Sequence, residues 1–261
     1  MILPDFTSFN WFLGLTFGLF IIIAGRYFLV AGLFYLIFYI WFPSKWKDRK
    51  INKRGYKPGQ LIKEMKWSLI NALLFAITAS ATVILWQKGY TKVYVETGLY
   101  DWWYLPLSLI VLMLVHETYY YWIHRWMHIP SVYKLVHKIH HDSKVASPFT
   151  AFSFHPIEGL LQAVFLPTMI FILPIHYYVI IIQLTIMTFS SVINHLDIEI
   201  YSRKKNSFWS KWVIGATHHS LHHKQFKYNY GLYFTFWDKI KKTESPEFKK
   251  IFELLTIKKK I

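Results

Sequence analysis

Most of the thirteen histidines in this cysteine-free chain occur in three short clusters. The clusters are "HRWMH" (His124 to His128), "HKIHH" (His137 to His141) and "HHSLHH" (His218 to His223). Within each cluster, histidines recur three or four residues apart, a spacing that places side chains on one face of an α-helix. Neutral imidazole is a good ligand for zinc, copper, iron and nickel. The spacing therefore predicts metal ligands.

The number of these histidines predicts two metal ions. A closed structural zinc site needs only about four ligands, which would leave the other histidines without a purpose. A surplus of groups that can serve a redox metal favours oxygen chemistry at iron, and a proton relay is the alternative. The candidate ligands, including one isolated histidine, are His124, His128, His137, His140, His141, His195, His219, His222 and His223.

Residues near the clusters have several interpretations. Glu117 lies seven residues before His124, where its carboxylate could accept an imidazole N–H and fix the tautomer of the ring. In "FHPIEG", His155 could be a tenth ligand or a helix cap, and the role of His218 as a ligand is open. Four more residues are expected to form hydrogen bonds or to line the membrane interface: His116, Tyr121, Asp197 and Asp238.

Hydropathy predicts an all-α, multi-pass membrane protein with four or more transmembrane helices and a helical cap that carries the histidines. Of the 261 residues, 54% are hydrophobic, and several apolar stretches reach the ~20 residues that cross a bilayer. The first could be a helical hairpin or one long span with a re-entrant part, and the last two predict a tight hairpin. The stretches are Trp11–Phe42, Trp67–Trp86, Tyr104–Ile123, Ile157–Pro174 and Tyr177–Ile193.

The placement of charge predicts how the chain lies in the membrane. A net charge of +16 would suit nucleic acid, but the basic residues gather in Ser44–Lys66 and after His195, whereas Gln87–Trp103 has few. Lys and Arg accumulate in cytoplasmic loops. We therefore expect a cytoplasmic site, no nucleic-acid partner, and His176 alone at the opposite tip. Residues 1–66 would form an N-terminal membrane segment with a basic loop, and residues 67–261 the catalytic domain.

The order of the motifs resembles the fatty acid hydroxylase/sterol desaturase superfamily of membrane di-iron enzymes, and within it the sterol delta-five desaturase type. The resemblance covers roughly Asp101 to Lys242. The matching segments are "YWIHRWMH", "VYKLVHKIHHDSKVASPFTAFSFHPIEG", "INHLD" and "HHSLHHKQFKYNYGLYFTFWDKI".

The resemblance implies that the three histidine boxes are catalytic and hold two iron ions, with His195 as a further ligand. Glu117 stands where the family usually has Asp. The implied activity is O2-dependent desaturation or hydroxylation of an unactivated C–H bond in a lipid. Electrons would come from a separate protein, a b-type cytochrome or a ferredoxin with its reductase.

Several alternatives remain open from the sequence. A sterol-like lipid is the first choice of substrate, and a fatty acyl or sphingolipid chain is the second. A metal or proton transporter and a non-catalytic membrane organiser are the non-enzymatic alternatives. The C-terminal "KKKI" (Lys258 to Ile261) suits retrieval to the endoplasmic reticulum, but a basic tail is also ordinary in a bacterial inner-membrane protein, which we favour.

Overall fold

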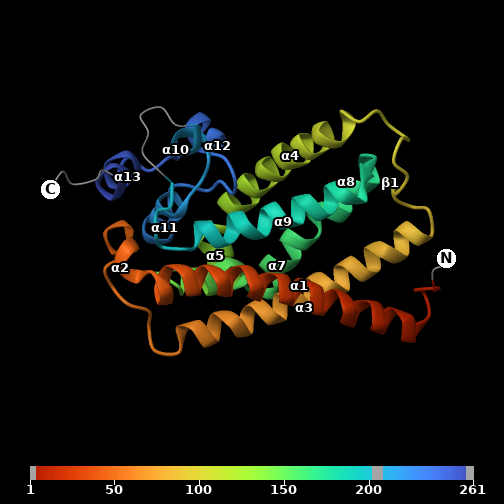
Figure 1. Cartoon of the computed structure of the whole chain (residues 1–261), viewed down its shortest axis with the longest axis horizontal. Coiled ribbons are helices and arrows are strands. Elements are labelled where there is room, and N and C mark those ends of the chain that lie inside the picture. Colours follow the sequence, from red (N-terminus) through yellow and green to blue (C-terminus); the bar gives the residue numbers. More distant parts are fainter. Residues whose placement is uncertain (1–3, 202–207, 257–261) are drawn as a thin grey trace.

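The computed structural model describes residues 4–201 and 208–256, so the C-terminal "KKKI" motif lies outside the described residues. The chain is mostly helical, as predicted. Its longest elements extend along the length of the molecule (Figure 1). These four helices are α1 (Phe9–Tyr35), α3 (Gln60–Gln87), α4 (Tyr104–Met127) and α9 (Tyr177–Asn194).

Three helices within the described ranges are long and apolar enough to cross a membrane: Phe9–Trp41, Gln60–Gln87 and Tyr177–Asn194. The chain is therefore an integral membrane protein, as predicted. The first of these helices is continuous, because a π-helical segment η1 (Leu36–Trp41) extends α1. Of the two alternatives for the first apolar stretch, the long span holds and the hairpin is wrong.

The other two predicted spans differ from the expectation. Helix α4 is long, but its second half carries His116 and Glu117, and it is not among the three. The predicted span Ile157–Pro174 is divided into α7 (Pro156–Ala163) and α8 (Phe165–Ile172). Together they form an apolar helical stretch of 17 residues, Pro156–Ile172, which rises about 26 Å and is slightly shorter than a ~30 Å hydrocarbon layer. A total of four or more spans remains a prediction.

The tight hairpin between the last two apolar stretches is confirmed. After α8 the chain forms β2 (Ile175–His176), which pairs in parallel with β1 (Val93–Tyr94), and α9 then runs back along the molecule. His176 therefore lies at the end of the molecule opposite to α11, which carries the third histidine cluster (Figure 1).

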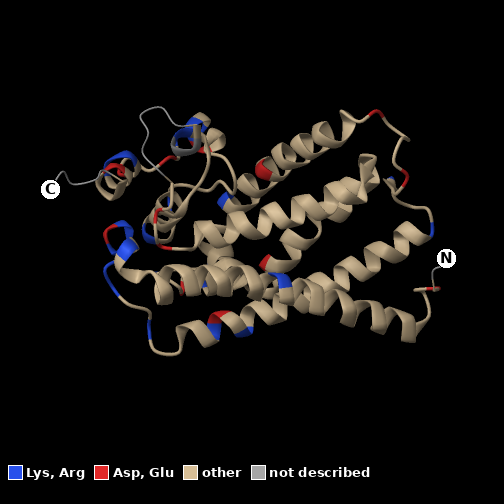
Figure 2. Ribbon diagram, viewed as in Figure 1, with Lys and Arg blue, Asp and Glu red and all other residues tan. Residues whose placement is uncertain are grey.

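Short helices gather at the histidine-bearing end of the long helices. Lys and Arg residues concentrate on the same end, whereas few mark the end near β1 (Figure 2). This distribution is the one expected from the charge pattern. The short elements are α2 (Pro43–Trp46), η2 (Lys47–Arg49), α5 (Pro130–Val136), α6 (Lys138–His141), η3 (Pro148–Phe152), α10 (Phe208–Trp212), α11 (Ala216–Gln225), α12 (Phe236–Ile240) and α13 (Phe248–Thr256).

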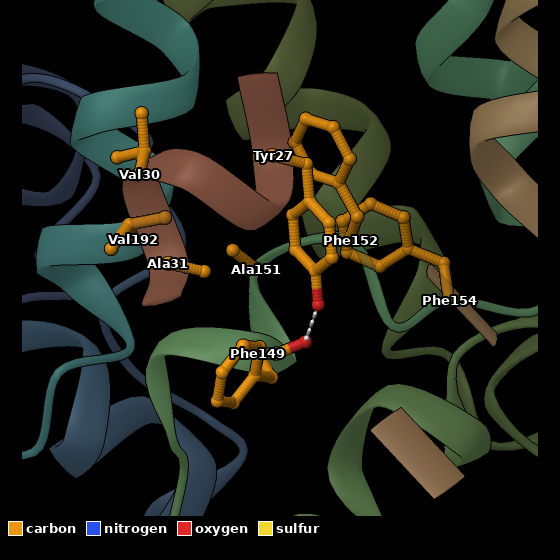
Figure 3. Close-up of a cluster of buried hydrophobic side chains, with 8 residues drawn as sticks. All are labelled: Tyr27, Val30, Ala31, Phe149, Ala151, Phe152, Phe154 and Val192. Atoms are coloured by element: carbon orange, nitrogen blue, oxygen red, sulfur yellow. Dashed lines mark hydrogen bonds between the residues drawn. The ribbon is translucent and has the colours of Figure 1, made fainter. Parts of the chain in front are cut away.

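A buried cluster joins α1 to η3 and α9 (Figure 3), and its Phe154 ring lies 5.1 Å from the His140 ring. The Tyr27 ring stacks on Phe152 with centroids 5.1 Å apart, and its hydroxyl donates to the Phe149 carbonyl at 2.8 Å. Because Phe149 and Phe152 follow the second histidine cluster along the chain, this packing fixes that segment against the longest apolar helix. The N-terminal helix thus supports the site, although the matching motifs all lie further along the chain.

Candidate metal centre

All nine predicted ligands meet in two neighbouring groups, each of which could hold a metal ion. Within each group the ligand nitrogens lie within 4.8 Å of one another. Every ring is buried except His128, which is partly buried. The five-histidine group contains His124, His128, His137, His141 and His222. The four-histidine group contains His140, His195, His219 and His223.

The assignment of each histidine to one of the two groups follows its position on the helix face, not the sequence cluster to which it belongs. Pairs four residues apart stay together: His137 with His141, and His219 with His223. Their immediate neighbours go to the other group, His140 to the four-histidine group and His222 to the five-histidine group. Adjacent side chains on a helix point about 100° apart, so one short helix can supply both sites.

The imidazole nitrogens are arranged as ligands rather than as hydrogen-bonding partners. The Nε2 atoms of His128 and His141 each lie 3.1 Å from Nε2 of His222, and those of His195 and His219 lie 2.9 Å apart. Metal–nitrogen bonds of about 2.05 Å would place two ligand atoms about 2.9 Å apart at a right angle and about 3.4 Å apart at a tetrahedral angle. The observed separations therefore fit a shared metal ion in each group.

The opposite ring nitrogens explain why the Nε2 lone pairs are free. Nδ1 of His124 lies 2.8 Å from the Tyr230 carbonyl, and Nδ1 of His195 lies 2.7 Å from the Ser191 carbonyl. His222 makes the same contact with the Tyr228 carbonyl at 2.7 Å. A carbonyl can only accept, so the proton must lie on Nδ1, and Nε2 is left as the metal-binding atom.

Burial keeps the clustered imidazoles neutral. Desolvation, followed by the proximity of other imidazoles, lowers the pKa of six of them well below the ordinary value of about 6.5. Burial also lowers the pKa of His195 to about 4. Neutral imidazole is the form that binds metal, so the groups are ready ligands at neutral pH. The six are His137, His140, His141, His219, His222 and His223.

A buried carboxylate that the sequence analysis missed lies beside His137, at ion-pair distance but without an aligned hydrogen bond. Glu158 Oε2 lies 2.8 Å from His137 Nδ1, and both side chains are inaccessible to solvent. Glu158 is in the first turn of α7, which packs closely on α3 at Gly159, where a Cβ would lie only 1.9 Å from Asn71 Oδ1. The motif "FHPIEG" contains this glutamate, but only its depth in the fold reveals the role.

Glu117 supports the site in a different way from the one predicted. Its carboxylate accepts backbone N–H groups of Leu232, Tyr233 and Phe234 at 2.6–3.2 Å, and no imidazole N–H. These residues follow directly after Tyr230, whose carbonyl binds the His124 ring. Glu117 therefore positions the loop that orients a ligand, and the predicted direct contact with an imidazole is wrong.

A second buried glutamate braces the segment after His141. Glu64 on α3 accepts hydrogen bonds from the hydroxyl groups of Ser143 at 2.6 Å and Thr150 at 3.0 Å, and from that of Ser147. Four hydrogen-bond donors, including the Gln60 amide, compensate for the burial of this carboxylate. This network ties the second histidine cluster to a predicted membrane span.

The remaining candidates lie outside both groups. His155 caps α7 by accepting the Ile157 N–H at 3.2 Å, so it is the helix cap of the two alternatives. His218 is buried 3.7 Å from Asp238, and Asp238 accepts the Tyr230 N–H. The other predicted helpers also have local partners: Asp197 with Asn52, Tyr121 with Thr243, and His116 with Gln183 and Tyr233.

A largely apolar cavity of about 520 Å³ reaches the four-histidine group. His195 and His219 form part of its wall, and Trp86 and Val93 line it near the opposite end of the molecule. Volumes of about 300–1,000 Å³ are typical of sites for single small molecules. Apolar side chains from several helices form much of the wall, among them Ile23, Phe75, Phe152, Leu166, Leu184 and Met187.

Comparison with known proteins gives consistent relatives. Lathosterol oxidase of Rattus norvegicus is 30% identical over 219 residues, covering 82% of this chain and 69% of the relative. Lathosterol oxidase of Homo sapiens is 33% identical over 188 residues, covering 69% of this chain and 60% of the relative. The Delta(7)-sterol 5(6)-desaturase of Candida albicans is 30% identical over 223 residues, covering 82% of this chain and 52% of the relative. No solved structure matches at a significant level.

A family profile agrees with these relatives and covers the site. Residues 109–243, just over half of the chain, match the profile of fatty acid hydroxylases. This range contains all nine clustered histidines together with Glu117 and Glu158. The relatives are oxidoreductases by name, and their similarity extends beyond the matched range. The chain therefore belongs to the fatty acid hydroxylase family.

Proposed function

We propose that this chain is an O2-dependent membrane oxidoreductase that desaturates or hydroxylates an unactivated C–H bond of a lipid. The observation that carries the proposal is the apolar cavity that reaches His195 and His219. A lipid in this cavity would lie directly against one of the two histidine groups. The names of the relatives, which are a sterol oxidase and sterol desaturases, support an enzyme over a transporter or an organiser.

We assign two iron ions as the cofactor, one held by each histidine group. Bound iron would supply the activation of oxygen and the oxidation of the C–H bond, and the protein supplies position and environment. The carbonyls of Ser191 and Tyr230 hold the rings of His195 and His124 in the metal-binding tautomer. Aromatic wall residues such as Phe152 keep water from the cavity next to the histidines. The placement of the lipid decides between an alkene and an alcohol.

We further propose that the site lies on the cytoplasmic side of a bacterial inner membrane, in a chain with four or more spans. The basic residues at the histidine-bearing end support this orientation (Figure 2). Electrons would then arrive from a separate cytoplasmic b-type cytochrome, or from a ferredoxin with its reductase. Residues 67–261 would form the catalytic domain, to which α1 of residues 1–66 adds part of the cavity wall.

The orientation can be tested because the chain has no cysteine of its own. Single cysteines at the exposed positions Lys138 and Lys224 should react with an impermeant reagent only from the cytoplasmic side. A cysteine at exposed Lys92 should react only from the other side. Reaction of the first two from opposite sides of the membrane would contradict the proposed orientation.

A sterol-like lipid is the first choice of substrate because of the relatives' names, and a fatty acyl or sphingolipid chain is the alternative. The test is expression in yeast that lacks its own sterol delta-five desaturase, followed by mass spectrometry of sterols and acyl lipids. New delta-five sterols would support the first choice, and newly hydroxylated or unsaturated acyl chains the alternative. A lipidome identical to that of the His219→Ala variant would contradict the proposed function.

A further inference from the structure

Arg26 is a charged residue in an unusual place. It is the single charged residue of the apolar helix Phe9–Trp41, and it lies close to the middle of that helix. Its side chain forms part of the cavity wall. The guanidinium Nε is buried and has no hydrogen-bond partner among the described residues. Within the part of the chain that the structure describes, a positive charge therefore lies beside an apolar cavity, and its Nε has no hydrogen-bond partner.

Ionised side chains at this depth need a partner. Arginine stays protonated in proteins, and a charge near the centre of a bilayer is costly unless it is paired or reaches the interface. Arg26 is fifteen residues from Trp41, about 22 Å along the helix, so it lies in the central part of the apolar helix. Glu64 accepts four hydrogen-bond donors, whereas Glu158 has Oε2 beside His137 and Oε1 without a hydrogen-bond partner. Neither carboxylate forms an ion pair with Arg26 among the described residues, which leaves room for a partner supplied by a bound ligand.

We infer that Arg26 binds the acidic group of a lipid whose apolar part occupies the cavity toward His195 and His219. A carboxylate or phosphate matches the planar guanidinium, which forms paired, charge-assisted hydrogen bonds with such groups. The inference rests on the proposed function, because it takes the cavity as the substrate site. Within the proposed function it favours the acyl-lipid alternative over the sterol-like first choice, and it makes Arg26 a specificity-determining residue.

The test compares two ligands that differ only in charge. The full chain is placed in lipid nanodiscs of neutral phosphatidylcholine without oxygen or reductant. Binding of a radiolabelled long-chain fatty acid is measured against the primary alcohol of the same length. The variants are Arg26→Leu and Arg26→Lys, and Arg54→Leu removes an exposed arginine of the basic loop as the matched control. Metal content is measured for each variant, so that loss of the fold is recognised.

The wild type and Arg54→Leu should prefer the acid. Arg26→Leu should bind the acid about tenfold to a hundredfold more weakly and the alcohol almost unchanged, since a charge-assisted contact is lost. Arg26→Lys should keep part of the preference. No preference for the acid in the wild type, or the same preference in Arg26→Leu, would overturn the inference. Tighter binding of a neutral sterol than of the acid by the wild type would also overturn it.

A second comparison separates the substrate from the surrounding bilayer. Anionic phosphatidylglycerol is added to the nanodiscs while the fatty acid is titrated. Unchanged acid binding supports a site for the substrate's own acidic group. Loss of acid binding would overturn that assignment, because a bilayer headgroup would then occupy Arg26. If the preference depends on Arg26 but no lipid is ever oxidised, the proposed function fails and the binding site stands.

Discussion

Replacing Glu158 should weaken metal binding in the five-histidine group and leave the four-histidine group unchanged. The carboxylate lies 2.8 Å from His137 Nδ1, and neither side chain has contact with solvent. Without it, the His137 ring loses the buried carboxylate beside Nδ1, whose negative charge favours a proton on that nitrogen and leaves Nε2 for the metal. Loss of such a partner typically reduces metal affinity about 10–100-fold, equivalent to about 1.4–2.7 kcal/mol. The four-histidine group does not include His137, so its affinity should not change.

Two variants distinguish the lost interaction from a lost volume. Glu158→Ala removes the acceptor and leaves a small void, whereas Glu158→Gln keeps the size and an acceptor oxygen but removes the charge. We expect the larger loss of affinity with alanine and a smaller loss with glutamine. Glu244→Gln is the control, because Glu244 is partly exposed and lies 3.8 Å from Lys239, away from both groups.

The assay is an anaerobic titration of the metal-free protein with iron(II) against a competing chelator. Wild type and Glu244→Gln should each bind two ions in two steps, and the affinity at each step should be similar in the two proteins. Glu158→Ala should show one step shifted to weaker binding and the other unaltered. Two steps shifted equally, or two unshifted steps in a folded variant, would show that Glu158 does not act through His137.

Two further predictions concern stability. Tyr27→Phe should lower the free energy of unfolding by about 1 kcal/mol, because the hydrogen bond to the Phe149 carbonyl is lost, and Tyr90→Phe at an exposed position should have no effect. Equal unfolding curves for the two variants in detergent would contradict this. The metal-free protein should lose stability as pH falls below about 6.5. Histidine in the unfolded chain binds a proton below this pH, whereas buried His195 in the folded chain stays neutral because its pKa is lowered to about 4. Each such histidine removes about 1.4 kcal/mol per pH unit, and constant denaturant midpoints between pH 7 and pH 5 would contradict the assignment.

Histidine spacing was enough to predict eight of the nine residues that meet at the site, and the isolated His195 was predicted from its place after the last apolar stretch. Imidazoles three and four residues apart must share a helix face, and this geometry is local. The division into two groups was not predictable, because it depends on how α6 and α11 face each other. Helix periodicity separates the adjacent His140 and His141, but the tertiary arrangement decides which histidines of the other helices join each of them.

The supporting carboxylates were harder to predict for the same reason. Glu64 lies about eighty residues before the hydroxyl groups that it accepts, and no local pattern links them. Glu117 was noticed from its spacing, but the backbone N–H groups that it binds come from a distant loop. The predicted span Ile157–Pro174 corresponds to an apolar helical stretch, Pro156–Ile172, with a turn at Val164 that hydropathy does not record because it reflects composition alone.

The central claim is that the nine histidines hold two iron ions, one in each group. The most direct measurement is anomalous diffraction at the iron edge from crystals of protein purified without oxygen from iron-replete cells. If each group holds one iron ion, two peaks per chain are expected. One should lie among His124, His128, His137, His141 and His222, and the other among His140, His195, His219 and His223. A single peak, or peaks outside these groups in iron-loaded protein, would contradict it.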